Sequence, residues 1–220
     1  MDLHTFRKIP RLTRECIVTE KLDGSNGQVY IHDSNNNLLF PFVKYEEIPS
    51  CDFIQEYCLA QKEGIYMFAG SRHRWLSTGK QNDSHGFASW VKENSEELFK
   101  LGEGRHYGEW YGKGIQRGYG LEEKRWALFN TSRWANKNEP LAEKQTYCPT
   151  CCEVVPILHI GPFETQSTQA CIDELKINGS RAVPGYMKPE GIVVYHTAGD
   201  VMFKKTIEKD EEWKGVQSES

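Results

Sequence analysis

Two pairs of β-like runs, each joined by a short turn, constrain the fold of this chain more than any other feature. Glu15–Lys21 (ECIVTEK) and Gln28–His32 (QVYIH) are rich in β-forming residues, and the small residues of Gly24–Gly27 separate them. Gly191–His196 and Val201–Thr206 alternate in the same manner around a four-residue turn. The second of these turns is hairpin-like, and the sequence predicts that antiparallel strands are prominent.

The rest of the chain mixes helices and strands without regular alternation. Further strands are expected over Leu38–Val43, Ile65–Ala69, Arg105–Trp110, Arg125–Asn130 and Val154–His159. Helical spacing of apolar residues is present in Asp52–Lys62, Gly86–Leu101 and Thr165–Lys176. Because no βαβ alternation indicates a Rossmann sheet, the sequence predicts an α+β fold with antiparallel sheets flanked by helices.

Length and composition fit one folded domain. The chain has 220 residues, 38% of them hydrophobic, and we expect a single domain over residues 1–220 with a frayed, charged tail from about residue 208. Its net charge of -4 provides no global positive field for a polynucleotide, so nucleic-acid binding would need a local basic face. The candidates for that face are Arg105, Arg117, Lys124 and Arg125.

The cysteines and the hydropathy pattern bear on the compartment. No apolar run approaches the roughly 20 residues of a membrane span, and the N-terminus lacks a secretion signal. Seven scattered cysteines are expected as free thiols in a reducing compartment, which indicates the cytoplasm, or the host cytoplasm if the protein is phage-encoded. Cys148 and Cys151, next to Cys152, could be half of a zinc site, but no second pair follows at a suitable spacing, and only folding could bring His159 and Cys171 to complete it.

Lys21 lies at the mouth of the first turn, in Lys21-Leu-Asp-Gly-Ser-Asn26. An amine held there suits nucleophilic attack on a phosphate, although most lysines beside a glycine are solvated turn residues. Asp23 either caps this turn or takes part in the chemistry.

Four later segments carry groups that such chemistry requires. Glu109, within a Tyr-Gly-Glu-Trp segment, can accept hydrogen bonds from ribose hydroxyls or help to place a metal, unless it is a surface carboxylate. The ring of Phe129 could stack on a nucleobase, or Phe129 could be a core residue of its strand. Glu190 stands before an apolar strand, where a carboxylate can bind a divalent metal. Arg72 offers a guanidinium fork for a phosphate.

Lys204 and Lys205 are adjacent in the last predicted strand, so they should point to opposite faces. One of them can contact a phosphate, and the other is then solvated or serves another ligand. We favour Lys205, because it lies on the side opposite Lys204, Met202 and Thr206.

In order and spacing these segments resemble the motifs of the covalent nucleotidyltransferases, and in particular the ATP-dependent RNA ligases of the small phage type. Lys-x-Asp-Gly-x-Asn is similar to the nucleotide-accepting motif, and Asn26 is similar to the RNA ligase branch, where DNA ligases usually carry an arginine. Two departures concern Asn130, where DNA ligases tend to have an aspartate, and the adjacent lysines, which the family usually separates by one residue. The resemblance covers residues 16–206.

The resemblance implies a ligase-type nucleotidyltransferase domain that uses ATP with Mg²⁺ or Mn²⁺ and joins RNA ends carrying a 5′-phosphate and a 3′-hydroxyl. Lys21 would bear AMP as a lysyl–AMP, with Lys204 or Lys205 at the α-phosphate and the other lysine serving RNA or solvated. A free lysine amine is mostly protonated at neutral pH, so nearby positive charge must favour its neutral form. The residues implied at the nucleotide are Glu20, Asn26, Arg72, Glu109, Phe129 and Glu190, with Glu109 and Glu190 also implied at the metal.

Only 20 residues precede Lys21 and 14 follow Thr206, so we expect no appended oligonucleotide-binding (OB) domain. The core would hold RNA by itself, or a partner protein or a structured substrate would position the ends. Two alternatives stay open: a nucleotide- or nucleic-acid-binding protein of this fold without sealing activity, and a minimal DNA ligase or GTP-using capping enzyme, against which Asn26 counts.

Overall fold

The computed structural model describes residues 9–35, 49–79 and 81–208. Contacts within the chain gather in two compact units: unit 1 comprises Met1–Leu22 and Val155–Ser220, and unit 2 comprises Asp23–Val154. The single domain over residues 1–220 stays a prediction. The expected strand Leu38–Val43 and the tail beyond residue 208 lie outside the described residues.

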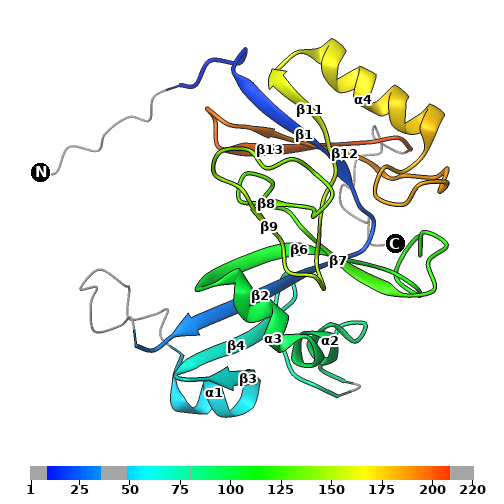
Figure 1. Ribbon diagram of the computed structural model, residues 1–220. Helices are drawn as coiled ribbons and strands as arrows, with labels where there is room; N and C mark the ends of the chain where they lie inside the picture. The colour runs from blue at the N-terminus through cyan, green and yellow to red at the C-terminus, as the bar shows by residue number, and fades with distance from the viewer. Residues whose placement is uncertain (1–8, 36–48, 80, 209–220) are drawn as a thin grey trace, which may run out of the picture. The chain divides into compact units, whose positions relative to one another are not determined.

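Unit 1 is a four-stranded antiparallel sheet with one long helix (Figure 1). The strand order is β11 (Ile157–Pro162), β1 (Glu15–Lys21), β12 (Gly191–His196) and β13 (Val201–Thr206). Alternate residues of β1 and β12 form a small core with helix α4 (Thr165–Asn178). The members of this core are Cys16, Val18, Cys171, Ile172, Leu175, Ile192 and Val194.

Unit 2 is built on a larger sheet in the order β10-β7-β6-β2-β4-β3, with β5 paired to β4 (Figure 1). Its strands are β2 (Ser25–Asp33), β3 (Cys58–Lys62), β4 (Ile65–Gly70), β5 (Trp75–Leu76), β6 (Gly104–Gly112), β7 (Lys124–Leu128) and β10 (Glu153–Val154). A separate two-stranded ladder joins β8 (Trp134–Ala135) to β9 (Thr146–Tyr147). The helices are α1 (Cys51–Tyr57), α2 (Phe87–Glu93), α3 (Ser95–Leu98) and a 3₁₀ turn, Phe99–Leu101.

The core of unit 2 is aromatic. Phe87 of α2 lies 5.4 Å and 5.6 Å, ring centre to ring centre, from Trp110 and Trp126 of the sheet. The helix can approach this closely because the strand beneath it carries Gly27, where a Cβ would lie 2.7 Å from the Phe87 ring. Side chains on the opposite face of the same strands point away from this aromatic core.

The predicted α+β class with antiparallel sheets is confirmed; in the described part of the chain, parallel pairing is limited to β7 with β10 and β8 with β9. The bounds of β1, β12 and β13 are those predicted.

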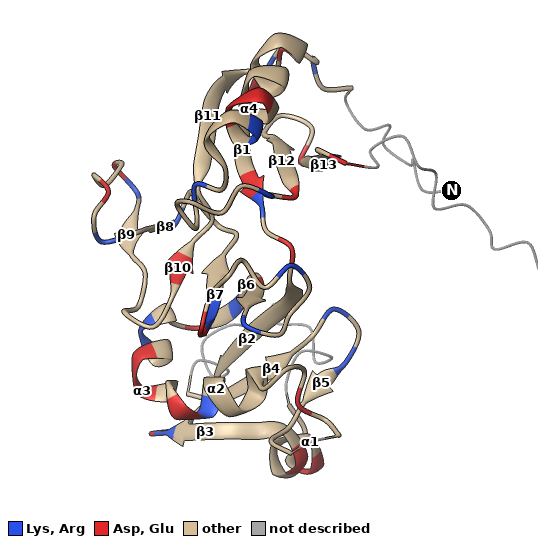
Figure 2. Ribbon diagram, turned by 90° about the vertical axis from the view of Figure 1, so that its right-hand side faces the viewer, with Lys and Arg blue, Asp and Glu red and all other residues tan. Residues whose placement is uncertain are grey.

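Acidic residues are concentrated on α3, which carries Glu96 and Glu97 (Figure 2). Among residues 9–35, 49–79 and 81–208, no helix is long and apolar enough to cross a membrane.

Two helix predictions were wrong in extent. The second half of Asp52–Lys62 is strand β3, because Cys58 to Lys62 pair with β4 across a tight turn at Glu63 and Gly64. Tertiary pairing has overridden a helical spacing here. The helix expected over Gly86–Leu101 breaks at Asn94, whose side-chain amide donates to the carbonyl of Trp90 and competes with the helical ladder.

Two strand predictions also needed correction. Val154–His159 divides at Pro156 between β10 of unit 2 and β11 of unit 1. The strand over Arg125–Asn130 ends at Leu128, because Asn130 accepts the backbone N–H of Arg133 and forms a turn.

Candidate functional site

Lys21 is the last residue of β1, and its side chain contacts Glu190. Nζ of Lys21 donates to Oε2 of Glu190 at 2.5 Å, and the two side chains are 24% and 17% exposed. Lys21 pairs in the ladder with Gly191, the first residue of β12, so Glu190 stands at the end of the neighbouring strand. Unit 1 thus brings an amine and a carboxylate together from positions 169 residues apart.

Gly191 allows β13 to pass close to this end of β12. A Cβ at Gly191 would lie 2.2 Å from the carbonyl oxygen of Lys205 and 2.8 Å from Cα of Thr206. Its φ of 156° is also one that residues with a side chain rarely adopt. The glycine that follows Glu190 is therefore required by the packing of the sheet.

Register decides which lysine of the pair shares a face with Lys21. Lys204 pairs with Val193, which pairs with Thr19 on the Lys21 face of β1. Lys205 pairs with Ile192 on the opposite face, and its Nζ donates to Gln169 of α4 at 2.9 Å. Lys204, rather than the favoured Lys205, therefore lies on the face of the nucleophile candidate, and which lysine contacts the phosphate stays a prediction.

Glu20 is buried, and its carboxylate contacts the loop after α4. The side chain is 1% exposed, with Oε1 accepting the hydroxyl of Ser180 at 2.6 Å. Oε2 accepts the backbone N–H groups of Arg181 at 2.8 Å and Ala182 at 2.9 Å. Burial raises the pKa of Glu20, and these hydrogen bonds act in the opposite direction. The Glu20 carboxylate therefore ties the end of β1, beside Lys21, to the loop after α4 within unit 1.

In unit 2 the expected nucleotide residues form a hydrogen-bonded chain. Glu109 of β6 is 9% exposed; Oε1 accepts the backbone N–H of Gly24 at 3.0 Å, and Oε2 accepts the side-chain amide of Asn26 at 3.1 Å. Asn26 in turn accepts Nε of Arg72 at 2.7 Å. An amide suits this position because it donates to a carboxylate and accepts from a guanidinium at once.

Asp23 anchors the turn after Lys21 to the loop that follows β6. Its backbone N–H donates to the hydroxyl of Tyr119 at 2.8 Å, and its carboxylate accepts Nε of Arg117 at 2.9 Å. These contacts favour the capping interpretation of Asp23 over a chemical one.

The four residues expected to form one basic face do not do so. Arg117 pairs with Asp23, Lys124 donates to the carbonyl of His85, and Arg125 pairs with Glu123 and Glu153. Arg105 instead lies over two aromatic rings. Lys124 and Arg125 are adjacent on β7 and point to opposite faces of the sheet, and Arg117 lies in the loop between β6 and β7.

Phe129 lies one residue beyond β7 and is 38% exposed. Its backbone N–H donates to the carbonyl of Tyr107 at 2.9 Å, so the two residues are neighbours across the sheet. Tyr107 is 51% exposed and lies two residues before Glu109 on β6. Sequence reasoning did not single out Tyr107, although its period-two spacing from Glu109 was a usable signal.

Comparison with known proteins identifies the family. A family model described as RNA ligase matches residues 14–206. The chain belongs to the RNA ligase family. No curated protein sequence matches it.

Among solved structures, RNA ligases of Naegleria gruberi are similar to this RNA ligase chain. A point mutant with ATP and Mn has a TM-score of 0.51 and 18% identity, covering 93% of this chain and 53% of its own. Another mutant with ATP and Mn, and one with AMP and Mn, have TM-scores of 0.49 and 0.48 and identities of 17% and 18%. The alignments with these two structures cover 91% and 92% of this chain and 52% and 53% of the matched chains. The first likeness shows the ligase-type nucleotidyltransferase fold, and the chain spans about half the length of the structures it matches.

The two carboxylates expected at a metal differ in their surroundings. Glu190 is partly exposed beside the Lys21 amine, and carboxylate oxygens are donors that Mg²⁺ and Mn²⁺ prefer, so this residue fits such an ion. Glu109 already gives each oxygen to a protein donor. The place of Glu109 at the metal stays a prediction.

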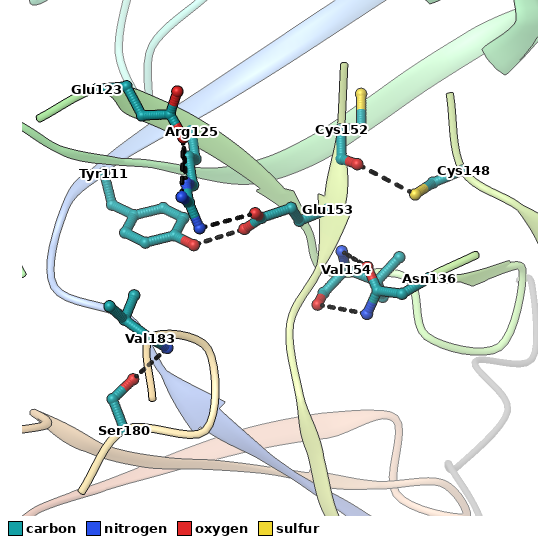
Figure 3. Close-up of polar contacts among 10 residues, drawn as sticks. All are labelled: Tyr111, Glu123, Arg125, Asn136, Cys148, Cys152, Glu153, Val154, Ser180 and Val183. Atoms are coloured by element: carbon teal, nitrogen blue, oxygen red, sulfur yellow. Dashed lines mark hydrogen bonds and ion pairs between the residues drawn. The ribbon is translucent and has the colours of Figure 1, made fainter. Parts of the chain in front are cut away.

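Two further clusters of this RNA ligase chain are structural (Figure 3). Glu153 of β10 accepts the hydroxyl of Tyr111 at 2.6 Å and Nη1 of Arg125 at 3.2 Å, and burial raises the pKa of Tyr111. The thiol of Cys148 donates to the carbonyl of Cys152 at 3.3 Å. No group of three His, Cys, Asp or Glu residues that could hold a metal ion is found among the described residues.

Proposed function

We propose that this chain is the catalytic core of an ATP-dependent RNA ligase that joins a 5′-phosphate to a 3′-hydroxyl through a lysyl–AMP on Lys21. The observation that carries the proposal is the pairing of the Lys21 amine with Glu190 at the ends of two adjacent strands, in a chain of the RNA ligase family. The N. gruberi mutant that shares the fold was solved with ATP and Mn, which supports the choice of nucleotide and of a divalent ion.

In the first step, Nζ of Lys21 attacks the α-phosphorus of ATP. An N–P bond forms, the bond from the α-phosphorus to the bridging oxygen breaks, pyrophosphate leaves, and the amine proton passes to solvent. Glu190 holds the amine in place, and a Mg²⁺ or Mn²⁺ bound there would neutralise phosphate charge and favour the neutral amine. An oxygen of the RNA 5′-phosphate then displaces Lys21 from AMP, and the RNA 3′-hydroxyl displaces AMP to form the phosphodiester.

Lys204 is the residue of unit 1 that we assign to the α-phosphate. It lies on the Lys21 face of the sheet, whereas Lys205 contacts α4. A positive charge at the α-phosphate stabilises the charge that accumulates in the transition state, so its removal should slow the first step by about 100-fold or more.

We assign nucleotide recognition to residues of unit 2. Phe129 is exposed and can stack on the base, which is worth about 1–3 kcal/mol. Glu109 accepts hydrogen bonds from ribose hydroxyls, and Arg72, held by Asn26, binds phosphate. Glu20 acts indirectly, by fixing the strand that carries Lys21.

The test is self-adenylylation with Mg²⁺ and α-labelled ATP after treatment with pyrophosphate, which removes AMP already bound. An acid-stable label is expected on the wild type and on Lys176→Ala, an exposed lysine of α4 in the same unit. Lys21→Ala should lose the label, and Lys204→Ala should lose far more of it than Lys205→Ala. Absence of label on the wild type, or its retention by Lys21→Ala, would refute the covalent mechanism.

Sealing assays then identify the polymer. Nicked and single-stranded RNA with 5′-phosphate and 3′-hydroxyl ends should be joined faster than the same DNA. Label without joining of any substrate would indicate a nucleotide-binding relative that needs a partner protein or has lost sealing. We also propose a cytoplasmic location, since all seven cysteines are free thiols.

A further inference from the structure

One face of the unit 2 sheet continues beyond the residues assigned to the nucleotide. Adjacent cross-strand rows on this face pair Asn26 with Glu109, then Gln28 with Tyr107, then Tyr30 with Arg105. Because side chains two apart on a strand share a face, all six project to the side opposite Phe87 and the aromatic core. Two residues along β6 correspond to about 7 Å, so each row lies within reach of the next.

The middle row is flat and carries exposed aromatic rings. Gln28 pairs with Gly70 on one side and with Tyr107 on the other, and Phe129 follows across the sheet. Gly70 contributes no side chain, and a Cβ there would lie 2.5 Å from the amide nitrogen of Gln28, so that amide lies across the glycine. Tyr107 is 51% exposed although β6 is an inner strand, whereas its neighbours Gly108 and Trp110 are buried.

The outer row holds an exposed positive charge on an aromatic support. The guanidinium carbon of Arg105 lies 4.3 Å from the ring centre of Tyr30 and 5.3 Å from that of Trp75. Tyr30 is itself packed on Phe68, with ring centres 5.8 Å apart. Such a cation–π arrangement orients the guanidinium while it stays exposed, and an oriented guanidinium suits a phosphate.

We propose that Tyr107, Gln28 and Arg105 form a subsite for single-stranded RNA, in which Tyr107 stacks on an unpaired base and Arg105 contacts the adjoining phosphate. The combination of an exposed ring with a neighbouring cation is the recurring means of binding single strands. The amide of Gln28 can donate to and accept from a base edge or a 2′-hydroxyl. This subsite deepens the proposed function and rests on it for the identity of the polymer.

The test is fluorescence anisotropy of the full chain with a labelled, 5′-phosphorylated single-stranded RNA over a range of salt concentrations. Tyr107→Ala should weaken binding by fivefold or more, and Tyr107→Phe, which keeps the ring, should bind within twofold of the wild type. Tyr147→Ala is the matched control, because Tyr147 of β9 is similarly exposed, at 45%, and lies outside this sheet. A duplex RNA should compete less well than the single strand, since its bases are stacked.

Arg105→Ala should weaken binding and reduce the slope of log K against log salt by about 0.7, the value for one phosphate contact on a single strand. Arg105→Lys should keep the slope, because it keeps the charge. Equal affinities for Tyr107→Ala and Tyr147→Ala, an unchanged slope for Arg105→Ala, or equal competition by duplex would overturn the subsite.

Self-adenylylation separates failure of this subsite from failure of the proposed function. Tyr107→Ala should label with ATP as the wild type does, because the first step uses no RNA. If the wild type labels and seals but Tyr107→Ala binds RNA normally, the subsite is wrong and the function stands. If the wild type never labels while Tyr107→Ala still weakens RNA binding, the function is wrong and the subsite stands.

Discussion

Replacing Glu20 by alanine should destabilise unit 1 by about 3–5 kcal/mol. The buried carboxylate accepts three hydrogen bonds, from the Ser180 hydroxyl and the backbone N–H groups of Arg181 and Ala182. Each donor that is left buried without an acceptor costs about 1–3 kcal/mol. Arg181 is exposed, so water can replace the acceptor there; the other two donors give about 2–6 kcal/mol, and the expected loss is the middle of that range. This is a large share of the roughly 5–15 kcal/mol that stabilises a typical domain.

The assay must report on unit 1, and tryptophan fluorescence reports mainly on unit 2. Five of the six tryptophans belong to unit 2, and the described residues of unit 1 contain none. Urea unfolding followed by far-UV circular dichroism gives the free energy of unfolding. Hydrogen exchange of the Arg181 and Ala182 amides should accelerate in Glu20→Ala, because both lose their acceptor.

Glu15→Ala is the matched control, since it removes an exposed glutamate from the same strand and should change stability by less than about 0.5 kcal/mol. Glu20→Ala should also reduce self-adenylylation, because the next residue is Lys21. A loss of stability below about 1 kcal/mol, or unchanged exchange at the two amides, would refute the view that Glu20 holds this loop.

Three further predictions concern unit 2 and the thiols. Asn26→Asp would bring a second carboxylate to about 3 Å from Glu109, so unit 2 should lose on the order of 2 kcal/mol at pH 7 and regain part of it at pH 4.5, as followed by tryptophan fluorescence in urea. Burial lowers the pKa of His106 below its unfolded value near 6.5, so its contribution to stability is present above pH 6.5 and is lost on acidification. His106→Gln should therefore flatten the fall in stability between pH 7 and pH 5, by at most about 1.4 kcal/mol per pH unit, and an unchanged slope would contradict this. Burial raises the pKa of Cys148 to about 11, so iodoacetamide at pH 8 should label exposed Cys51 well before Cys148, as peptide mass spectrometry would show; equal rates would contradict the burial of Cys148.

Local pattern alone located the strands that carry the candidate chemistry. Alternation of apolar residues, ended by turn residues, gave β1, β12 and β13 their bounds, because a period of two is a property of the strand itself. Lys21, Glu190 and Phe129 could also be singled out as candidates from residue type and order. Pattern failed at β3, where pairing with β4 converted a helical spacing into a strand.

Only the tertiary structure decided how these candidates are used. The contact between Lys21 and Glu190 depends on which strands are neighbours, and no local signal contains that choice. Lys204 and Lys205 are equivalent in the sequence, and it is the register of β13 on β12 that turns one toward Lys21 and the other toward α4. A shift of one residue would exchange them, and the short turn of residues 197–200 that joins the two strands fixes their register. Residue order thus specified the chemical groups, and strand pairing and register specified which of them share a face.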